Sequence, residues 1–509
     1  MAFFIVGIVS CKTQHAPTNL TEIALIPKPV SVTANGEAFE LSTGTTIYIQ
    51  ESDELAKVGQ YLVNLLKPAT GFSLSVQTTT SIPSKGVWLS LIDDQHLGVE
   101  GYKLSVNKNL VALQANSPEG VFRGLQTIRQ MLPHEIEAST VQQIKWIIPG
   151  GEIFDYPEYA FRSSMLDVAR HFFSVADVKH YIDLMTAYKM NFFHIHLSDD
   201  QGWRIEIKSW PKLTETGAKT QVGGGNGGFF TQEQYKEIID YAAERYITVI
   251  PEIDMPGHTN AALASYAELN CDGKARELYT GTEVGFSSLC VDKEITYKFV
   301  NDVIREMAAL TPGDYIHIGG DESHSTKKED YIKFIDRVQD IVVSHGKVLI
   351  GWDEVTHAAL INDLAVAQYW SSADNAKRAV EKGVSLIISP AKKAYIDMKY
   401  DSLTTLGLQW AGFVEVKTGY DWDPTTLEKE ISRDNILGIE APLWTETIGN
   451  RTDLQFMVMP RLPGYGEIGW TPSNMPNWDE YKVRLAEHGK RFKIAGINFY
   501  SSKQVPWTE

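Results

Sequence analysis

Eight short apolar runs alternate with amphipathic stretches from Tyr159 onwards, and this alternation constrains the fold more than any other feature of the sequence. Apolar runs that alternate with helical patterns are typical of βα units and a parallel sheet. Eight such units are the number that closes a (β/α)8 barrel, so we predict an α/β protein with a TIM barrel. The predicted strands are 161–169, 191–198, 248–254, 315–320, 348–352, 365–370, 385–389 and 436–443.

The helical stretches between these strands carry signals of their own. Thr231 and Gln234 have the spacing of a capping box at the start of one predicted helix. Apolar residues then follow at helical spacing, which predicts the face that packs on the barrel: Tyr235, Ile238, Ala242 and Tyr246.

The residues before the barrel show a different order of strand-like and helical patterns. A chain of 509 residues is too long for one average domain. Strand-like runs at 45–50, 87–92, 102–106 and 110–114 precede a helical pattern at 118–131, with a hairpin turn predicted at 107–109. We predict a leader and linker at 1–22, a smaller α+β domain at 23–150 and the barrel at 151–509. Because the smaller domain shows no cluster of acids, we assign it no chemistry.

The carboxyl ends of barrel strands form the active-site face in such folds, which converts the strand prediction into a list of residues. Every predicted end delivers polar or aromatic side chains, and this convergence indicates a site. In chain order these residues are Asp167 and Arg170; His194 to Asp200; Glu252 to His258; Asp321 and Glu322; Trp352 to Glu354; Tyr369 and Trp370; Tyr395 and Asp397; and Trp444 to Glu446.

Two adjacent acids, Asp321 and Glu322, follow a buried run and two glycines, Gly319 and Gly320. Glycines allow a sharp turn and a close approach. Buried carboxylates are costly without a partner, so acids here are expected to serve a purpose. A glycosidase needs one acid to protonate the leaving oxygen and another to handle positive charge at the sugar carbon. The simpler alternative is an Asp-Glu pair that caps the next helix.

The net charge of the chain limits the kinds of molecule that it is expected to bind. The chain carries a formal charge of −17, which disfavours nucleic acid or an anionic membrane surface as a ligand. Its 12 Trp and 22 Tyr suit sugar binding, because aromatic faces stack on the apolar faces of sugar rings, although most of them will be core.

The three cysteines carry information on the cellular compartment in which the protein is expected to reside. Cys11 follows a short apolar run at residues 3–9 that resembles a secretory signal whose cleavage leaves a lipidated cysteine, as in bacterial lipoproteins. No Lys or Arg precedes that run, so the alternative is a simple apolar N-terminus. We expect export to the periplasm or the outer membrane of a bacterium, with a lipid anchor at Cys11. In such a compartment Cys271 and Cys290 could form a disulfide; otherwise they are two buried thiols.

Taken together, several of these stretches resemble family 20 glycoside hydrolases, the β-N-acetylhexosaminidases, over nearly the whole chain from about residue 23. The most specific is His317-Ile318-Gly319-Gly320-Asp321-Glu322. The supporting stretches occur in the expected order: 166–172, 194–204, 251–258, 351–354 and 444–446. The resemblance implies an exo-acting retaining enzyme that removes terminal non-reducing β-linked N-acetylglucosamine or N-acetylgalactosamine, with no cofactor and no metal.

The resemblance also implies a mechanism with which the spacing agrees. A retaining enzyme with its own nucleophile holds two carboxyl groups about 5–5.5 Å apart across the bond. Asp321 and Glu322 are chain neighbours, with Cα atoms about 3.8 Å apart, so that arrangement is awkward. Substrate-assisted catalysis through an oxazolinium intermediate avoids it. Glu322 would be the general acid and base, protonated at working pH, and Asp321 would orient the acetamido group.

The remaining positions match family residues that bind the sugar or set the environment of the acid. Asp199 and His258 match the latter, although His258 could instead stabilise its turn. Arg170, Asp397 and Glu446 match binders of sugar hydroxyls, and Tyr395 matches the residue that hydrogen-bonds the acetamido carbonyl. The apolar enclosure of the acetamido group and ring is matched by Trp352, Trp370 and Trp444, with Trp410 placed more loosely by its order in the chain.

Three other interpretations compete. His194 and His196 resemble ligands of metal-dependent barrel hydrolases, but the middle strands offer Trp352, Asp353 and Trp370 rather than further ligands. Residues 223–228 satisfy a Gly-x-Gly-x-x-Gly pattern outside a compact βαβ unit, which favours a loop at the mouth over a phosphate cradle. A catalytically inactive sugar-binding protein on the same scaffold is the third. The sequence leaves open gluco versus galacto preference, the leaving group and the oligomeric state.

Overall fold

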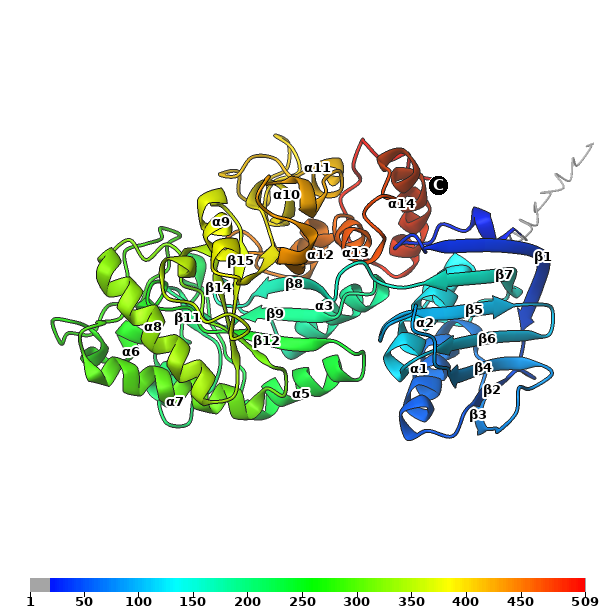
Figure 1. Ribbon diagram of the computed structural model, residues 1–509, viewed down its shortest axis with the longest axis horizontal. Helices are drawn as coiled ribbons and strands as arrows, with labels where there is room; N and C mark the ends of the chain where they lie inside the picture. Colours follow the sequence, from blue (N-terminus) through cyan, green and yellow to red (C-terminus); the bar gives the residue numbers. More distant parts are fainter. Residues whose placement is uncertain (1–18, 509) are drawn as a thin grey trace, which may run out of the picture. The chain divides into compact units, whose positions relative to one another are not determined.

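Eight parallel strands close into a barrel in the computed structural model, which describes residues 19–508 (Figure 1). The barrel order is β12-β13-β14-β15-β16-β17-β8-β9. Its strands are β8 (Phe161–Asp167), β9 (Phe192–His196), β12 (Thr248–Glu252), β13 (Tyr315–His317), β14 (Val348–Trp352), β15 (Ala365–Tyr369), β16 (Ser385–Ile388) and β17 (Ile436–Leu443). The predicted barrel is confirmed.

The predicted strand ends differ from the observed ones in one direction. The predictions 348–352 and 436–443 match β14 and β17. Each of the other six observed strands ends one to three residues before the end that was predicted for it. The cause is visible after β13, where Gly319 and Gly320 adopt φ of +65° and +97° and turn the chain out of the sheet. The apolar pattern alone does not distinguish the last residue that pairs in the sheet from the first residue of the loop that follows.

Helices surround the barrel and bury its outer face (Figure 1). The capping box of Thr231 and Gln234 is present at the start of α5 (Gln232–Ala243), which buries Tyr235, Ile238 and Ala242 but ends before Tyr246. The other long helices of this unit are α3 (Val175–Ala187), α7 (Glu294–Leu310), α8 (Lys328–Ser344), α9 (Ala373–Glu381), α12 (Arg451–Val458), α13 (Leu462–Trp470) and α14 (Trp478–Ile494). The short ones are α4 (Lys212–Glu215), α6 (Asn260–Ser265), α10 (Ala391–Ala394) and α11 (Val416–Tyr420).

The barrel interior changes character along its axis. Near the start of the strands an apolar cluster fills it, with Phe161, Ile250, Ile350, Val366 and Ile387 buried together. Towards the carboxyl ends the inward residues become charged or polar, including the buried His194, Glu252 and Glu440. Along the barrel axis, the apolar cluster is therefore followed by a layer of buried polar residues, and the mouth of the barrel lies beyond that layer.

A separate unit precedes the barrel and comprises residues 19–25 and Ser31–Asp155. Its seven-stranded sheet has the order β1-β7-β5-β6-β4-β2-β3 and is accompanied by α1 (Asp53–Thr70) and α2 (Pro118–Met131). The strands are β1 (Ser31–Leu41), β2 (Thr46–Ile49), β3 (Ser75–Thr78), β4 (Gly86–Leu91), β5 (Tyr102–Val106), β6 (Leu110–Ala115) and β7 (Trp146–Asp155).

Sequence patterns located the middle of this sheet better than its edge. The hairpin between β5 and β6 closes at Asn107, whose backbone N–H donates to Leu110 O at 3.0 Å. The pattern missed both edge strands, β1 and β3, as well as β7 and the helix α1. Strands β1 and β7 pair with each other, with a register shift between Ala34 and Ala38. Because β7 runs on to Asp155, this unit extends past the boundary expected at residue 150. Among residues 19–508 no helix is long and apolar enough to cross a membrane.

Candidate active site

The turn after β13 presents the two adjacent acids. A Cβ atom on Gly319 would lie 1.9 Å from Oδ1 of Asp254, so only glycine allows that carboxyl group to approach. Asp254 Oδ1 in turn accepts the backbone N–H of Gly320 at 3.1 Å. Glu322 itself adopts φ of +45°, an uncommon conformation for a residue with a side chain and one that concentrates at functional sites. The surrounding contacts therefore fix the direction in which the acids point.

Neither acid caps a helix, so the simpler interpretation of the pair is wrong. The next helix, α8, begins at Lys328 with Lys327 at its N-cap. Asp321 is buried and its Oδ1 has no hydrogen-bond partner among the described residues. Glu322 is more accessible, with 28% of its side chain exposed. An unpaired buried oxygen beside a reachable acid is suited to a ligand that supplies the missing contact.

His258 joins both acids to a buried carboxylate. Its Nε2 lies 3.6 Å from Asp321 Oδ2 and 3.5 Å from Glu322 Oε2, and its Nδ1 lies 3.2 Å from Asp199 Oδ1. Burial opposes a positive charge on this ring, but the carboxylates of Asp199 and Asp321 raise the pKa of His258 well above its ordinary value. His258 is thus more than a residue that stabilises its turn, because its ring lies between the two adjacent acids and Asp199.

Arg170 completes the charge balance on the other side of Asp199. Its Nη2 lies 2.8 Å from Asp199 Oδ2 and its Nη1 lies 3.3 Å from Asp167 Oδ2. Burial opposes the ionisation of Asp199, yet the charges of Arg170 and His258 hold its pKa well below the usual range. The arginine is buried rather than part of a surface ion pair, and its Nε has no partner among the described residues.

The two acids favour opposite protonation states in the free protein. Burial and the neighbouring Asp254 raise the pKa of Asp321 well above its ordinary value, although His258 opposes the shift. Burial also acts to raise the pKa of Glu322, but the close approach and positive charge of His258 outweigh it, so that pKa is lowered. We expected Glu322 to be the protonated acid, and this expectation is corrected for the free protein because His258 lies beside it. Burial likewise raises the pKa of Asp254, to about 7.

Aromatic side chains form a wall next to the acids. Trp352, Tyr395 and Trp444 are buried in one cluster, with ring centroids 5.6 Å apart for Trp352 and Trp444 and 6.3 Å apart for Tyr395 and Trp444. Trp370 stacks on Tyr395 at 6.2 Å. Trp410, 57% exposed, stands edge-on to both at 5.9 and 5.8 Å. The wall thus joins all the tryptophans that the sequence singled out, and it can enclose a small apolar group and a ring face.

Further polar groups converge on the same mouth. The guanidinium of Arg170 lies 4.7 Å from the Trp444 ring. Burial raises the pKa of Asp397 well above its ordinary value and Glu446 adds to the effect. Burial also raises the pKa of Glu446, against the charge of Arg170. Both oxygens of Asp397 and Oε2 of Glu446 have no partner among the described residues, so hydroxyl groups of a ligand would satisfy them.

A buried polar layer beneath the mouth holds these residues in place. Glu252 accepts the indole N–H of Trp352 at 2.9 Å and approaches His194, His196 and His317 at 3.0, 2.5 and 3.0 Å. The sequence placed Glu252 at a strand end but gave it no role. Its only signal was an acid at the end of an otherwise apolar strand, and such an acid requires partners when it is buried.

Four groups of histidines and carboxylates have ligand atoms within 4.8 Å of one another: His194, Glu252 and His317; His196, Asp199 and Asp254; Asp199, Asp200 and His258; and Asp254, His258 and Asp321. His194 and His196, the residues that resemble metal ligands, also make hydrogen bonds to carboxylates. His194 Nδ1 lies 2.9 Å from Glu440 Oε1, and His196 Nε2 lies 2.9 Å from Asp199 Oδ2. Each of these hydrogen bonds gives one ring nitrogen a buried carboxylate partner.

The remaining sequence features are the glycine-rich segment and the three cysteines. Val222 and Gly223, at the start of the glycine-rich segment, donate backbone N–H groups to Arg170 O and Thr280 O at 2.9 Å each, so the segment is a loop beside the site. Cys271 and Cys290 form a disulfide. Cys11 lies outside the described residues.

Comparison with known proteins gives one consistent result. The model of the glycosyl hydrolase family 20 catalytic domain matches residues 159–473, and that of family 20 domain 2 matches residues 22–156. A β-N-acetylhexosaminidase of Cellulomonas fimi is 39% identical over 96% of this chain and 98% of its own length. A β-hexosaminidase of Porphyromonas gingivalis is 34% identical over 97% of this chain and 67% of its own.

Solved structures agree. The family 20 β-N-acetylhexosaminidase of Streptomyces coelicolor A3(2) superposes with a TM-score of 0.92 at 50% identity, covering 95% of this chain and 99% of that one. A mutant of the Streptomyces plicatus β-hexosaminidase, in complex with its product GlcNAc, has the same TM-score at 51% identity, covering 95% and 98%.

Proposed function

Because the chain belongs to glycosyl hydrolase family 20 and is a β-N-acetylhexosaminidase, we propose that it removes terminal non-reducing β-linked N-acetylhexosamine with retention of configuration. The nucleophile is the carbonyl oxygen of the substrate's own 2-acetamido group. The observation that carries this proposal is the approach of Asp321 and Glu322 to one nitrogen atom of His258. Acids that share a neighbour lie side by side and do not face each other across a sugar.

The proposed reaction has two steps. The acetamido oxygen attacks the anomeric carbon while the bond to the leaving oxygen breaks and Glu322 donates its proton to that oxygen. The bicyclic intermediate carries positive charge near the acetamido nitrogen, where the carboxylate of Asp321 stabilises it, and the hydroxyl of Tyr395 donates to the acetamido oxygen. Water then attacks the anomeric carbon from the vacated side as Glu322 takes its proton. The bond between that carbon and the acetamido oxygen breaks, which regenerates the acetamido group and restores the starting β configuration.

Substrate binding supplies the protonation states that this reaction needs. The free protein favours a proton on Asp321 and a charge on Glu322. The acetamido N–H donates to Asp321, which favours the ionised form of that acid, while the leaving group removes water from Glu322 and favours its neutral form. A coupled pair that carries one proton can therefore exchange its location when the sugar binds.

A panel of aryl glycosides tests the activity. We expect the purified enzyme to release the aryl alcohol from the N-acetyl-β-glucosaminide or the N-acetyl-β-galactosaminide, and to leave the plain β-glucoside essentially uncleaved. Binding of N-acetylglucosamine without turnover of any of the three would instead identify a catalytically inactive sugar-binding protein on this scaffold.

We also propose that the enzyme is exported and anchored through a lipid on Cys11, in the periplasm or outer membrane of a bacterium. The apolar run before Cys11 supports this, as does the Cys271–Cys290 disulfide, because disulfides persist in oxidising compartments. We expect Cys11→Ser to move activity from the membrane fraction to the soluble fraction of cells that express the full chain. The same distribution for both forms would contradict the anchor.

A further inference from the structure

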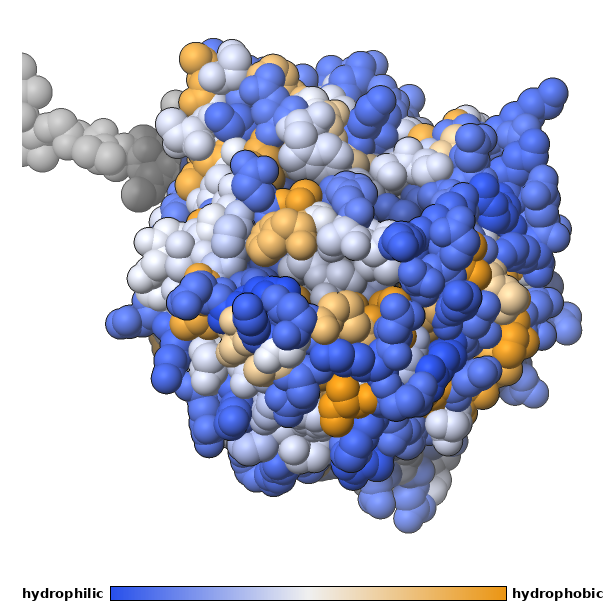
Figure 2. All heavy atoms as spheres, turned by 90° about the vertical axis from the view of Figure 1, so that its left-hand side faces the viewer, coloured by the Kyte–Doolittle hydropathy of each residue, from blue (hydrophilic) through white to orange (hydrophobic). Residues whose placement is uncertain are grey.

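A cavity of about 210 Å³ opens near the start of the barrel strands. Its lining comes from three segments of the barrel unit: Tyr159 directly before β8, residues 420–424 between α11 and β17, and Ile468, Ser473 and Pro476 in or after α13. The catalytic mouth lies at the other end of the strands, on the face that Figure 2 shows. Because β8 has 7 residues and a strand rises about 3.3 Å per residue, the two ends are about 20 Å apart.

The hydroxyl of Tyr159 is an unpaired donor at this cavity. Tyr159 is 1% exposed, and its hydroxyl has no hydrogen-bond partner among residues 19–508. Burial raises the pKa of Tyr159, and the charges of Glu158 and Asp423 act in the same direction, against that of Arg433. The hydroxyl therefore keeps its proton. Buried polar groups are nearly always paired, so an unpaired one that lines a cavity indicates that a ligand supplies the partner.

Arg433 makes the cavity unsuitable for a cation. Its guanidinium carbon lies 4.1 Å from the centroid of the Tyr159 ring, and its Nε lies 3.0 Å from Glu158 Oε1. A cationic ligand would be repelled by this fixed positive charge, and the cation–π contact with Tyr159 is already made by the arginine. The ligand is therefore expected to be neutral.

Two carboxylates add hydrogen-bond acceptors to the lining. Asp423 Oδ1 accepts the backbone N–H and the hydroxyl of Thr425 at 2.8 Å each, which fixes the orientation of the carboxylate. Asp421 Oδ2 lies 3.7 Å from Lys417 Nζ, so its charge is partly balanced. Carboxylate oxygens accept from hydroxyl groups, and the lining therefore offers a neutral ligand both acceptors and the donor of Tyr159.

Aromatic side chains supply an apolar surface between these polar groups. Trp422 is half-buried, and its indole N–H donates to Gly419 O at 2.9 Å. The hydroxyl of Tyr420 donates to Glu467 Oε1 at 2.7 Å, and its ring stacks on Tyr481 with centroids 3.9 Å apart. Because the polar atoms of Trp422 and Tyr420 already have partners, these two residues offer the cavity the apolar faces of their rings.

We propose that this cavity is a second binding site for a neutral pyranose ring, which stacks on Trp422 and forms hydrogen bonds with Tyr159 and Asp423. A pyranose carries hydroxyl groups around its edge and C–H groups on its faces, so it needs donors, acceptors and an aromatic surface together. The volume suits one ring rather than a longer ligand. The proposal goes beyond the proposed function, because the site lies at the other end of the barrel and uses none of the catalytic residues.

The proposal is tested by measuring sugar binding while the catalytic mouth is blocked. A thiazoline analogue of the bicyclic intermediate occupies the mouth, since ligands that resemble the reacting state bind tightly. The blocked wild-type enzyme is then titrated with four neutral sugars, N-acetylglucosamine, glucose, galactose and mannose, and binding is followed by tryptophan fluorescence and ligand-observed NMR. We expect at least one of the four to bind.

Variants of the lining assign that binding to the cavity. Tyr159→Phe removes only the unpaired hydroxyl and should weaken the affinity for the sugar about fivefold, the effect of one neutral hydrogen bond, with no loss of thermal stability. Trp422→Ala should weaken it about tenfold, whereas Trp422→Phe keeps an aromatic face and should retain most of it. Trp507→Ala, at another half-buried tryptophan that does not line the cavity, is the matched control and should bind as the wild type does. All four variants should cleave an aryl N-acetylglucosaminide at the wild-type rate.

Two results would overturn the assignment. One is that none of the four sugars binds the blocked wild-type enzyme, in which case the cavity holds only water. The other is wild-type affinity in both Tyr159→Phe and Trp422→Ala, which would place the second binding event elsewhere. Failure of the proposed function is a different outcome, in which the wild type neither cleaves the aryl N-acetylhexosaminides nor binds the thiazoline.

Discussion

Replacement of Glu322 by Gln should lower kcat for the disaccharide of two β-linked N-acetylglucosamines by about 10²–10⁴-fold, the usual contribution of a positioned general acid. Gln keeps the size and much of the hydrogen bonding of the acid but has no proton to give. Affinity for N-acetylglucosamine should therefore stay close to that of the wild type. Steady-state kinetics combined with calorimetric titration of the sugar separates the two effects.

The same variant should respond to the chemistry of the leaving group. An acidic phenol such as dinitrophenol leaves without protonation, so its glycoside should lose much less activity in Glu322→Gln than the disaccharide does. Asp321→Asn is the matched comparison, because it keeps the proton donor and removes the charge that stabilises the intermediate. That variant should lose activity on both substrates. Equal losses on both substrates in Glu322→Gln would assign the proton donor to another group.

The dependence of kcat/KM on pH shows whether activity requires the protonated or the ionised form of Glu322. Glu322 must carry a proton when the bond breaks, and the charge of His258 lowers its pKa in the free protein. The acid form is therefore lost as pH rises, and kcat/KM of the wild type should fall on the alkaline side when the coupled pair loses its proton. Gln cannot titrate, so this alkaline limb should disappear in Glu322→Gln when the dinitrophenyl substrate is used.

Strand prediction succeeded here because buried parallel strands are nearly continuous apolar runs. The pattern is unambiguous at 348–352, where β14 matches residue for residue. It fails at the ends of strands, as at Gly319, because a change of backbone direction leaves apolar composition unaltered. In the smaller unit it fails for β1 and β7, since the charged residues and glycines of these strands break the alternation.

The sequence indicated which residues lie together at the mouth of the barrel, but it did not indicate the protonation states of the two adjacent acids. Position at a strand end is enough to bring Arg170, Asp199 and His258 together, since all parallel strands end at one face. Which acid keeps the proton depends on distances of a few ångströms. His258 approaches Glu322 to 3.5 Å, whereas Asp321 has Asp254 among its neighbours, and spacing along the chain carries no information on either contact.

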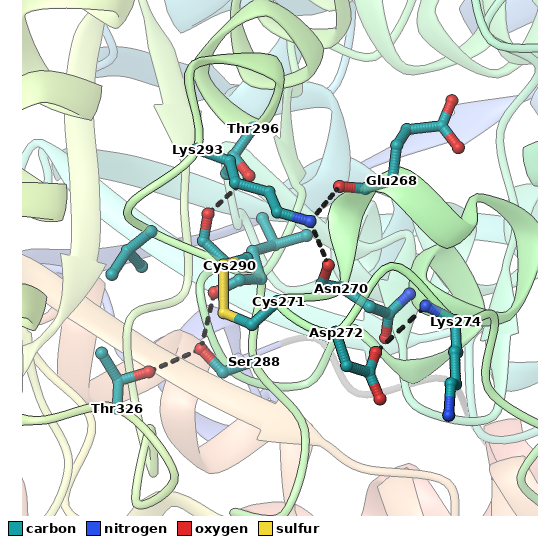
Figure 3. The surroundings of a disulfide bond; sticks show 12 residues. Glu268, Asn270, Cys271, Asp272, Lys274, Ser288, Cys290, Lys293, Thr296 and Thr326 are labelled. Atoms are coloured by element: carbon teal, nitrogen blue, oxygen red, sulfur yellow. Dashed lines mark hydrogen bonds between the residues drawn. A yellow bond between two sulfur atoms is a disulfide. The ribbon is translucent and has the colours of Figure 1, made fainter.

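The disulfide-closed segment of residues 271–290 (Figure 3) could not be placed from sequence patterns, for another reason. Residues 271–290 contain neither a strand nor a helix. Their sequence offers two cysteines whose pairing it leaves open. The disulfide, the hydrogen bonds of Ser287 and the contact of Gly285 with Glu322 are all long-range in the chain, so they emerge only from the folded structure.

The nucleophilic role of the acetamido group is tested most directly by changing that group alone. A series of aryl β-glucosaminides with N-acetyl, N-fluoroacetyl, N-difluoroacetyl and N-trifluoroacetyl groups keeps the leaving group constant while each fluorine withdraws electrons from the attacking oxygen. We expect kcat to fall at every step, by about a thousandfold overall, which corresponds to about 4 kcal/mol of barrier. A rate that stayed constant across the series would contradict acetamido participation and require a nucleophile from the protein.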